Sequence, residues 1–256
     1  MPRVTTYSAV SGAIGGGRFF VADRNARAGR GLEDRVPLLD AFRVPRGRYK
    51  AGRAAQLSGV PERTIYDWAR HGALVPDFPN ARPKRWSYRD LVYLRLLVRL
   101  RTLGMDRDAA SRCVAQTRDL LASGEVQVGS VHIARTGVYL PSESHDRLSG
   151  QGTISEVLAL TERFDLLAPL DGVSDRPLYG PDLVYPSEHT YISPWVMGGE
   201  PCVNETRIPT ATVIALVELR GLTTGDVLAL YPSLTTEGVE DAVALERRLG
   251  GIAVGT

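Results

Sequence analysis

The residues whose side chains point most clearly to a chemical role are basic residues between positions 49 and 86. They are Arg63, Arg70, Arg82, Lys84 and Arg85. A guanidinium group presents a planar fork of N–H donors that matches phosphate oxygens in pairs. Of the 31 basic residues in the chain, only Lys50 and Lys84 are lysines. This preference for arginine favours contacts with phosphate groups, although a bias in codon usage explains it equally well.

The basic residues are concentrated in the first part of the chain. The 256 residues include 31 Lys and Arg against 29 Asp and Glu. Residues 1–110 hold 21 basic and 10 acidic side chains, a net charge of +11, whereas residues 111–256 hold 10 and 19, a net charge of −9. Such a split points to a polyanionic partner for the basic part.

Enzymatic and metal chemistry find little support. The histidines show no i, i+4 pairing and no neighbouring cysteine, so no metal site is predicted; they are His71, His132, His145 and His189. Gly15–Gly17 lacks the following lysine and the preceding strand of a phosphate-binding loop. No catalytic residue and no cofactor are therefore predicted, and a metal-dependent nuclease remains a remote alternative.

Cellular location follows from composition. Cys113 and Cys202 are the only cysteines and lie far apart, which gives neither a disulfide framework nor a zinc pattern. No apolar run approaches the roughly 20 residues that span a bilayer. We expect a cytoplasmic protein that associates with the nucleoid when it is bound to DNA.

The basic side chains fall on a pattern of short helices. Residues 51–57 are predicted as a helix, residues 58–61 as a break, and Glu62–His71 as a second helix that ends at Gly72. Two short helices joined by such a turn are typical of a helix-turn-helix, whose second helix lies in the DNA major groove. Ile65, Trp68 and Ala69 have the spacing of an inward face. The predicted outward or marginal residues are Glu62, Arg63, Thr64, Tyr66, Asp67, Arg70 and His71.

A small hairpin is predicted over residues 74–86, where it would bring Arg82, Lys84 and Arg85 to flanking phosphates. Ser87 has the position of an N-cap. The remaining predicted elements are helices over 87–103, 107–121 and 154–166, a hairpin over 126–140 that turns at 135–137, a linker over 169–186, and helices over 210–220, 224–231 and 235–249. The fold class is therefore mainly α with small β elements (α+β).

The first of these patterns resembles a known family. Tyr49–Ala55, Ser58–Tyr66, Gly72–Pro76, Arg85–Leu91 and Leu100–Met105 together resemble the winged helix-turn-helix of the MerR family. The resemblance implies a domain whose recognition helix and wing both contact DNA. The long dimerisation helix of the family and the cysteines of its metal-sensing members are missing from the sequence.

The C-terminal part resembles a second family. Ile192–Pro201, Thr206–Pro209, Gly221–Thr223 and Tyr231–Thr235 are similar to a small domain of unknown function, number 433, that recurs in VapB-type antitoxins. This resemblance implies a PIN-type ribonuclease toxin as a partner. Candidate toxin-binding residues are Arg147, Arg176, Arg207, Arg247 and Arg248, which would neutralise acidic side chains of the toxin. The residues alone favour a structural role, in which Gly198–Gly199 forms a sharp turn with positive φ and Arg207 caps or braces the first helix of this part.

Four regions are expected. They are a flexible Gly- and Arg-rich arm (1–48), a winged helix-turn-helix domain (49–124), a hairpin, helix and linker region (125–186) and an antitoxin-type domain (187–250). The combined hypothesis is an antitoxin and autorepressor that binds operator DNA as a homodimer. The alternative is a MerR-like regulator without a toxin partner. An arm that enters the minor groove and a second DNA-binding unit in the acidic C-terminal part are weaker alternatives.

Overall fold

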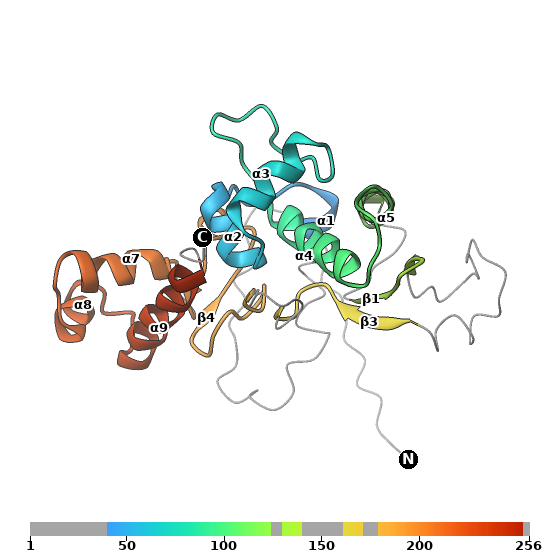
Figure 1. Cartoon of the computed structure of the whole chain (residues 1–256). Coiled ribbons are helices and arrows are strands. Elements are labelled where there is room, and N and C mark those ends of the chain that lie inside the picture. Colours follow the sequence, from blue (N-terminus) through green and yellow to red (C-terminus); the bar gives the residue numbers. More distant parts are fainter. Residues whose placement is uncertain (1–39, 124–129, 140–160, 171–178, 253–256) are drawn as a thin grey trace, which may run out of the picture.

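The fold combines helices with small antiparallel sheets, which confirms the predicted α+β class (Figure 1). The computed structural model describes residues 40–123, 130–139, 161–170 and 179–252. The helices are α1 (Asp40–Arg43), α2 (Ala51–Ser58), α3 (Glu62–Arg70), α4 (Tyr88–Thr102), α5 (Arg107–Ser123), the 3-10 turn η2 (Met197–Gly199), α7 (Thr210–Ile214), the π-helical turn η3 (Ala215–Leu219), α8 (Thr224–Leu230) and α9 (Thr236–Ile252). The strands are β1 (Ser130–Ala134), β2 (Gly137–Tyr139), β3 (Glu162–Asp165), β4 (Thr190–Tyr191) and β5 (Cys202–Val203).

Local sequence signals set the ends of the N-terminal helices. Gly59 takes a φ of 75° directly after α2, a left-handed conformation that glycine adopts readily, and the chain turns there into α3. At the start of α4, the Ser87 hydroxyl accepts a hydrogen bond from the N–H of Asp90, and the Asp90 carboxylate accepts one from the N–H of Ser87. This capping box confirms Ser87 as the predicted N-cap.

Helix α4 is buried on nearly every side, although its apolar residues have the spacing of one broad face. The difference comes from Arg95, which is fully buried and draws distant loops onto the helix. Its guanidinium donates hydrogen bonds to the carbonyl oxygens of Leu57 at 2.6 Å, of Ala168 at 2.7 Å, and of Pro181. Burial lowers the pKa of Arg95 to about 10. The last turn of α2 and the segments that follow β3 are thereby held on α4.

A three-stranded sheet in the order β2-β1-β3 follows α5. Ala134 pairs with Gly137 and Ile133 with Val138, so the hairpin turns at Arg135 and Thr136 as predicted. Strand β3 pairs antiparallel with the other edge of β1.

The helix predicted over residues 154–166 is wrong in its last part. Glu162–Asp165 forms β3, and residues 154–160 lie outside the described part of the chain. A short segment of mixed polarity carries no decisive period, so pairing with the free edge of β1 decides its conformation.

The three C-terminal helices α7, α8 and α9 enclose a core of their own. Helical spacing predicts Val213, Val227 and Val239 in this core, and all three lie there. The same spacing is wrong for Leu230, which is exposed, and for Leu245, which lies in the core around α4.

Helix α8 begins at a capping box formed by Thr223 and Asp226. The Thr235 hydroxyl accepts a hydrogen bond from the N–H of Gly238 at the start of α9. The threonines at these two joints are therefore caps, as their positions indicated.

The first of these helices differs from the prediction. It was expected over residues 210–220, but α7 ends at Ile214 and continues as η3. Pro209 precedes α7, and the Thr210 hydroxyl donates a hydrogen bond to the carboxylate of Glu246 instead of capping the helix. Pairing with this buried carboxylate outweighs the local capping preference.

Helix α2 joins the two parts of the fold through a cluster that we call the joint (Figure 1). Two guanidinium nitrogens of Arg53 donate to the carboxylate of Glu246 on α9 at 2.9 and 2.7 Å, and its Nε donates to Glu200 at 2.8 Å. The hydroxyl of Tyr49 donates to the carbonyl oxygen of Gly199 at 2.7 Å. Only 12% of the Arg53 side chain and 9% of the Glu246 side chain are exposed, so water screens their attraction weakly.

The predicted linker is packed at both of its described ends. Residues 171–178 lie outside the described part of the chain, but Leu170 and Leu183 are buried in the same core as α4. Leu245 and Leu249 of α9 belong to this core as well. Burial of these apolar residues orders the ends of the segment, although its Pro- and Asp-rich composition is typical of a linker.

The predicted arm is also ordered at its end. Residues 1–39 lie outside the described part of the chain, whereas Asp40–Arg43 forms α1. Phe42 is buried, and its ring centroid lies 6.3 Å from that of Tyr93 on α4. Burial of this aromatic side chain brings residues 40–48 into the packed N-terminal part.

Candidate nucleic-acid interface

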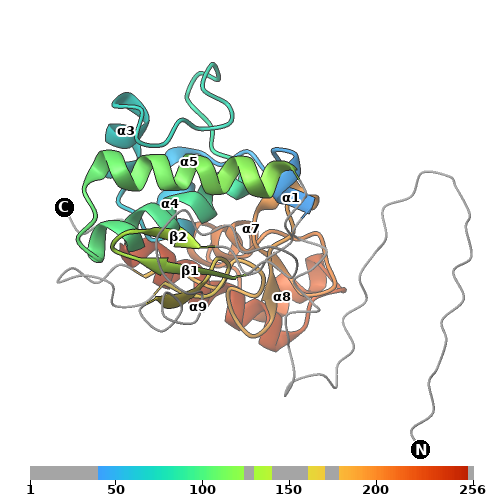
Figure 2. The same cartoon turned by 90° about the vertical axis from the view of Figure 1, so that its right-hand side faces the viewer.

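Helix α3 and the loop of residues 71–86 project together from one end of the molecule, as two perpendicular views show (Figures 1 and 2). Ile65 is buried, and Trp68 and Ala69 pack half-buried on the same core. The predicted inward face of α3 is therefore confirmed. Its remaining side chains are turned toward the outside.

Two arginines on α3 are available to an anion. Arg63 and Arg70 are both exposed. Neither forms an ion pair with any residue in the described ranges. Thr64 between them is half-buried. A helix with two unpaired guanidinium groups on its outer face favours a partner rich in phosphate.

The other charged residues of α3 interact within the protein. The Glu62 carboxylate lies over α2, where a Cβ placed on Gly52 would come within 3.4 Å of it. The His71 Nδ1 atom lies 3.1 Å from the Asp67 carboxylate and 2.9 Å from its carbonyl oxygen. These three predicted contact residues are exposed; Asp67 and His71 orient each other, whereas Glu62 only lies close to α2.

An aromatic contact links α3 to the following loop. The rings of Tyr66 and Trp86 meet edge to face, with centroids 5.4 Å apart and an interplanar angle of 83°. Trp86 is fully buried, whereas 38% of Tyr66 is exposed. Tyr66 thus has one side on the protein and the other open to a ligand.

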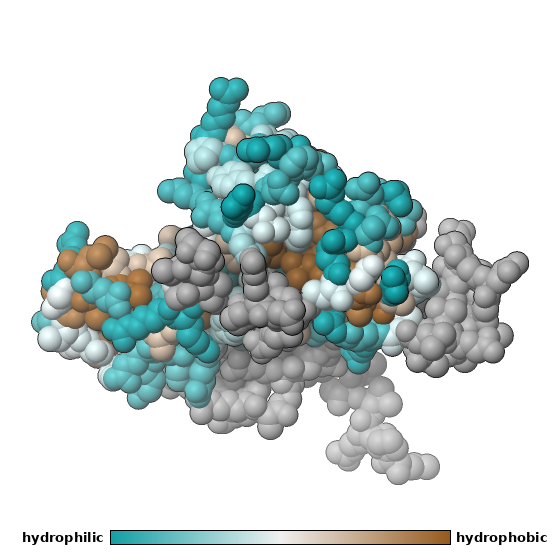
Figure 3. Space-filling view, in the orientation of Figure 1, coloured by the Kyte–Doolittle hydropathy of each residue, from teal (hydrophilic) through white to brown (hydrophobic). Residues whose placement is uncertain are grey.

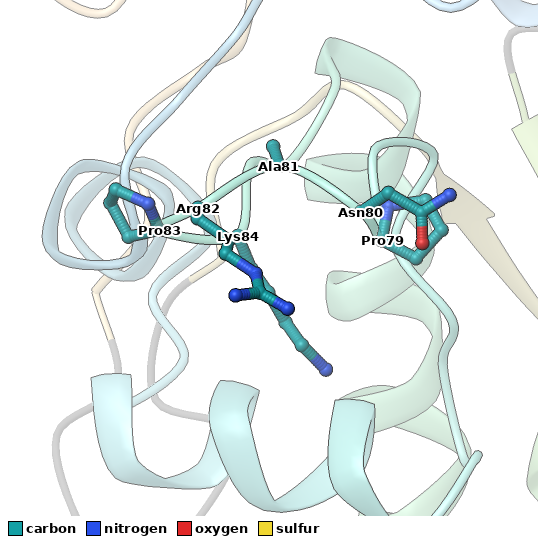
Figure 4. Close-up of a pocket in the computed structure, with 6 residues that line it drawn as sticks. All are labelled: Pro79, Asn80, Ala81, Arg82, Pro83 and Lys84. Atoms are coloured by element: carbon teal, nitrogen blue, oxygen red, sulfur yellow. The ribbon is translucent and has the colours of Figure 1, made fainter.

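We call residues 71–86 the wing. Phe78 and Arg85 pair across it, and Trp86 pairs with Tyr49 just before α2. The tip residues 79–84 line a concave surface made by this one loop (Figure 4). The wing is therefore a hairpin-like loop, as predicted. The concave surface is formed by the inner side of this loop alone.

The three predicted cations of the wing divide into two kinds. Arg82 and Lys84 point in the same direction in Figure 4. Neither pairs with an acidic residue in the described part of the chain. Arg85 is half-buried, and one of its terminal nitrogens is enclosed with no hydrogen-bond partner among the described residues. Arg82 and Lys84 can reach an anion, whereas Arg85 supports the wing from inside.

Sequence reasoning missed a basic segment beside the wing. Arg46, Arg48 and Lys50 are exposed just before α2. The Arg48 guanidinium lies 4.8 Å from the centroid of the Phe78 ring, so this segment lies against the wing. Their alternation was a signal, but Arg46 and Arg48 were assigned to the arm and Lys50 was not counted among the contact residues.

A buried carboxylate supports the base of the wing. Asp90 accepts hydrogen bonds from the N–H groups of Asp77 and Ser87 at 2.9 and 2.8 Å through one oxygen. Its other oxygen is buried without a hydrogen bond, 3.6 Å from the Arg118 guanidinium. Burial, with the nearby charge of Asp77, raises the pKa of Asp90 to about 6.

The Asp90→Asn variant is expected to remove a pH dependence of folding. Because the folded-state pKa of Asp90 is raised, its contribution to stability is fully present below its unfolded pKa near 4 and is lost as the pH rises through 6. Relative to the variant, the wild type should lose on the order of 3 kcal/mol of unfolding free energy between pH 4 and pH 7. Urea unfolding at several pH values measures this difference.

Asp226 provides the control for that measurement. Hydrogen bonds from Thr223 lower the pKa of Asp226, so its stabilising effect is present at neutral pH and is lost as the pH falls. Asp226→Asn should therefore change the pH profile in the opposite sense. Parallel profiles for the wild type and Asp90→Asn would contradict the prediction for Asp90.

Three of the five candidate toxin-binding arginines lie in the described part of the chain, and they have different neighbours. Arg147 and Arg176 lie outside the described part of the chain. Arg247 donates to Glu218 at 2.8 Å, and the Arg248 guanidinium lies 5.9 Å from the Tyr179 ring centroid. Arg207 is exposed, and no ion pair joins it to a described residue.

The described residues hold neither a candidate metal site nor a candidate membrane-spanning helix. Within residues 40–123, 130–139, 161–170 and 179–252, no three His, Cys, Asp or Glu side chains gather as a group that could hold a metal ion. In the same ranges, no helix has both the length and the apolar character needed to cross a membrane.

Comparison with known families matches two segments. Residues 49–117 match the family model described as "MerR HTH family regulatory protein", and residues 191–245 match "Protein of unknown function (DUF433)". No curated protein and no solved structure matches the chain significantly. The chain thus carries a MerR-family helix-turn-helix domain, which indicates a DNA-binding regulator, and a DUF433 domain.

Proposed function

We propose that this protein is a transcriptional repressor that binds double-stranded operator DNA through α3 and the wing. The observation that supports this most strongly is the presence of four cations without acidic partners among the described residues, all at one projecting end of the molecule. They are Arg63 and Arg70 on α3 and Arg82 and Lys84 on the wing. This end of the molecule is strongly hydrophilic (Figure 3).

The proposed division of work follows from helix-turn-helix geometry. The second helix of such a pair lies in the major groove, where Arg63 and Arg70 would contact guanine edges or phosphates. Arg82 and Lys84 would contact phosphates beside the groove. Thr64 and Tyr66 would complete the contact face of α3. Glu62, Asp67, His71 and Arg85 would act by orienting their neighbours.

Two copies of the chain would bind a palindromic operator, one recognition helix to each half-site. Helix α5 ends at Ser123, and the next described element is the β1–β2 hairpin instead of a long helix. We therefore assign the dimer contacts to the part of the chain after residue 125.

Salt dependence tests DNA binding directly. The affinity for a duplex enriched from a random library should fall steeply with salt, because each neutralised phosphate contributes a slope of about −0.9 in log K against log salt concentration. Contacts by the four unpaired cations predict a slope of about −4 per protomer or steeper. Gel-shift titrations at several salt concentrations measure it, and binding that does not respond to salt would refute the proposal.

A second candidate function is that of an antitoxin that neutralises a PIN-type ribonuclease toxin and represses its own operon. The observation in its favour is an exposed apolar surface on α8 and η3 (Figure 3). Leu219 is 84% exposed and Leu230 is 58% exposed. Exposed apolar groups of this size mark protein-binding sites, and π-helical turns such as η3 are frequent at functional sites.

Co-expression tests the antitoxin hypothesis. A small nuclease encoded beside this chain should co-purify with it and lose its ribonuclease activity in the complex. If the neighbouring genes encode no such protein, or if the nuclease stays active, the regulator without a toxin partner is the better description.

A further inference from the structure

Asp77 lies within the wing, five residues before Arg82, and its carboxylate is buried. Only 4% of its side chain is exposed, although aspartates are seldom buried to this degree. One carboxylate oxygen accepts hydrogen bonds from Arg89 at 2.7 Å and from Arg118. The other accepts from Arg89 at 2.7 Å and from the Ser87 hydroxyl at 2.5 Å. Every oxygen of this carboxylate therefore has two donors.

The donors fix the wing to two helices. Ser87 and Arg89 belong to the N-cap and first turn of α4, and Arg118 belongs to α5. Arg118 also donates to the carbonyl oxygen of Val75 at 2.9 Å, so it holds the wing at a second point. The peptide N–H of Asp77 donates to Asp90 on α4. The side chain and the backbone of Asp77 are thus both anchored.

Asp77 keeps its charge in this environment. Burial opposes its ionisation, but hydrogen bonds from Arg89 and Ser87 outweigh burial and lower its pKa below the ordinary value. A buried ion pair of this kind adds little stability over apolar residues of similar size. The two parallel hydrogen bonds from Arg89 do fix the orientation of the Asp77 carboxylate relative to α4.

We propose that Asp77 is a positioning residue for DNA binding, which holds the wing at the angle to α3 that lets both contact one duplex. Arg82 and Lys84 lie five and seven residues after Asp77, so a change of direction at Asp77 moves them far more than it moves Arg63 and Arg70 on α3. The Tyr66–Trp86 contact closes the other end of the wing onto α3. This inference rests on the proposed DNA binding.

A double-mutant cycle with the wing cations tests the proposal. The full chain would be titrated, by gel shift, with a duplex enriched from a random library by the wild type. Asp77→Asn and the pair Arg82→Ala/Lys84→Ala should each weaken binding by about tenfold or more and lower the salt slope by about 2. Asp77→Asn should have almost no further effect once the wing cations are gone.

The contrary result is equally defined. If Asp77→Asn weakens binding by the same factor with and without the wing cations, Asp77 acts through general stability and the proposal is wrong. Asp226→Asn, which alters a cap on α8, should leave the affinity within twofold. If Asp77→Asn does not fold, Asp77→Glu keeps the charge on a longer side chain and should show the same non-additive pattern with a smaller loss.

Hydrogen exchange separates this inference from the proposed function. In the free protein, Asp77→Asn should speed exchange of the amides of residues 78–86 and leave those of α3 and α4 unchanged. Unchanged exchange in the wing would overturn the inference even if DNA binds. If the wild type enriches no duplex at all, the proposed function fails, and faster exchange would then establish only that Asp77 holds the wing.

Discussion

The Arg63→Ala/Arg70→Ala double variant is expected to bind its enriched duplex at least about a hundredfold more weakly than the wild type. Each charged hydrogen bond to DNA contributes about 1.5–3 kcal/mol, and 1.4 kcal/mol corresponds to a factor of ten in affinity. Both side chains are exposed and lack ion-pair partners among the described residues, so their loss should leave the melting temperature nearly unchanged. Gel-shift titration and thermal unfolding of the same preparation measure the two quantities.

A matched variant separates specific contacts from net charge. Arg163→Ala/Arg220→Ala removes the same charge from exposed positions on β3 and after η3. Its DNA affinity should fall by less than about threefold, since these positions lie away from the projecting end. Equal losses for the two double variants would refute a specific role for α3. Arg70→Ala alone should weaken DNA binding and leave any toxin binding intact.

The Gly199→Ala variant should have the largest effect on stability, a loss of about 3–5 kcal/mol of unfolding free energy. Gly199 has a φ of 89°, and a Cβ there would lie 2.0 Å from the hydroxyl of Tyr49. Relief of this clash requires Tyr49 to move, which breaks its buried hydrogen bond to Gly199 and disturbs the joint. Urea unfolding followed by tryptophan fluorescence measures the loss.

The neighbouring glycine provides the control. Gly198 has a φ of 68°, but a Cβ there would meet no atom within 4 Å. Gly198→Ala therefore pays the conformational cost alone, about 1–2 kcal/mol. If the two variants lose the same stability, the contact with Tyr49 does not constrain Gly199.

Local signals explain why much of the fold could be predicted from the sequence. The break after α2 and the capping box at Ser87 depend on residues within a few positions of one another. The outward positions of Arg63 and Arg70 follow from the helical period alone. The positive φ values of the Gly198–Gly199 turn were predicted on the same local basis.

The failures involve partners far apart in the sequence. Residues 162–165 lack a decisive period and became a strand because β1 offers a free edge. The packed ends of the predicted linker depend on Arg95, whose acceptors lie up to 86 residues away. The sequence also gave no sign that Asp77 would accept two arginines of different helices. Conversely, the pairing of Asp67 with His71 spans one helical turn and could have been predicted from their spacing.

The glycines of the joint limit which helix-turn-helix domains could replace this one by recombination. Tyr49 is flanked by Gly47 and Gly199, and a Cβ at Gly47 would come within 3.0 Å of the Tyr49 ring and 3.1 Å of the Gly198 carbonyl oxygen. A helix-turn-helix module exchanged into this chain would therefore need its own aromatic residue and small neighbour at these positions. It would also need a cation at position 53 for the carboxylates of Glu200 and Glu246. The two modules are therefore expected to be inherited together, with covarying residues at their contact.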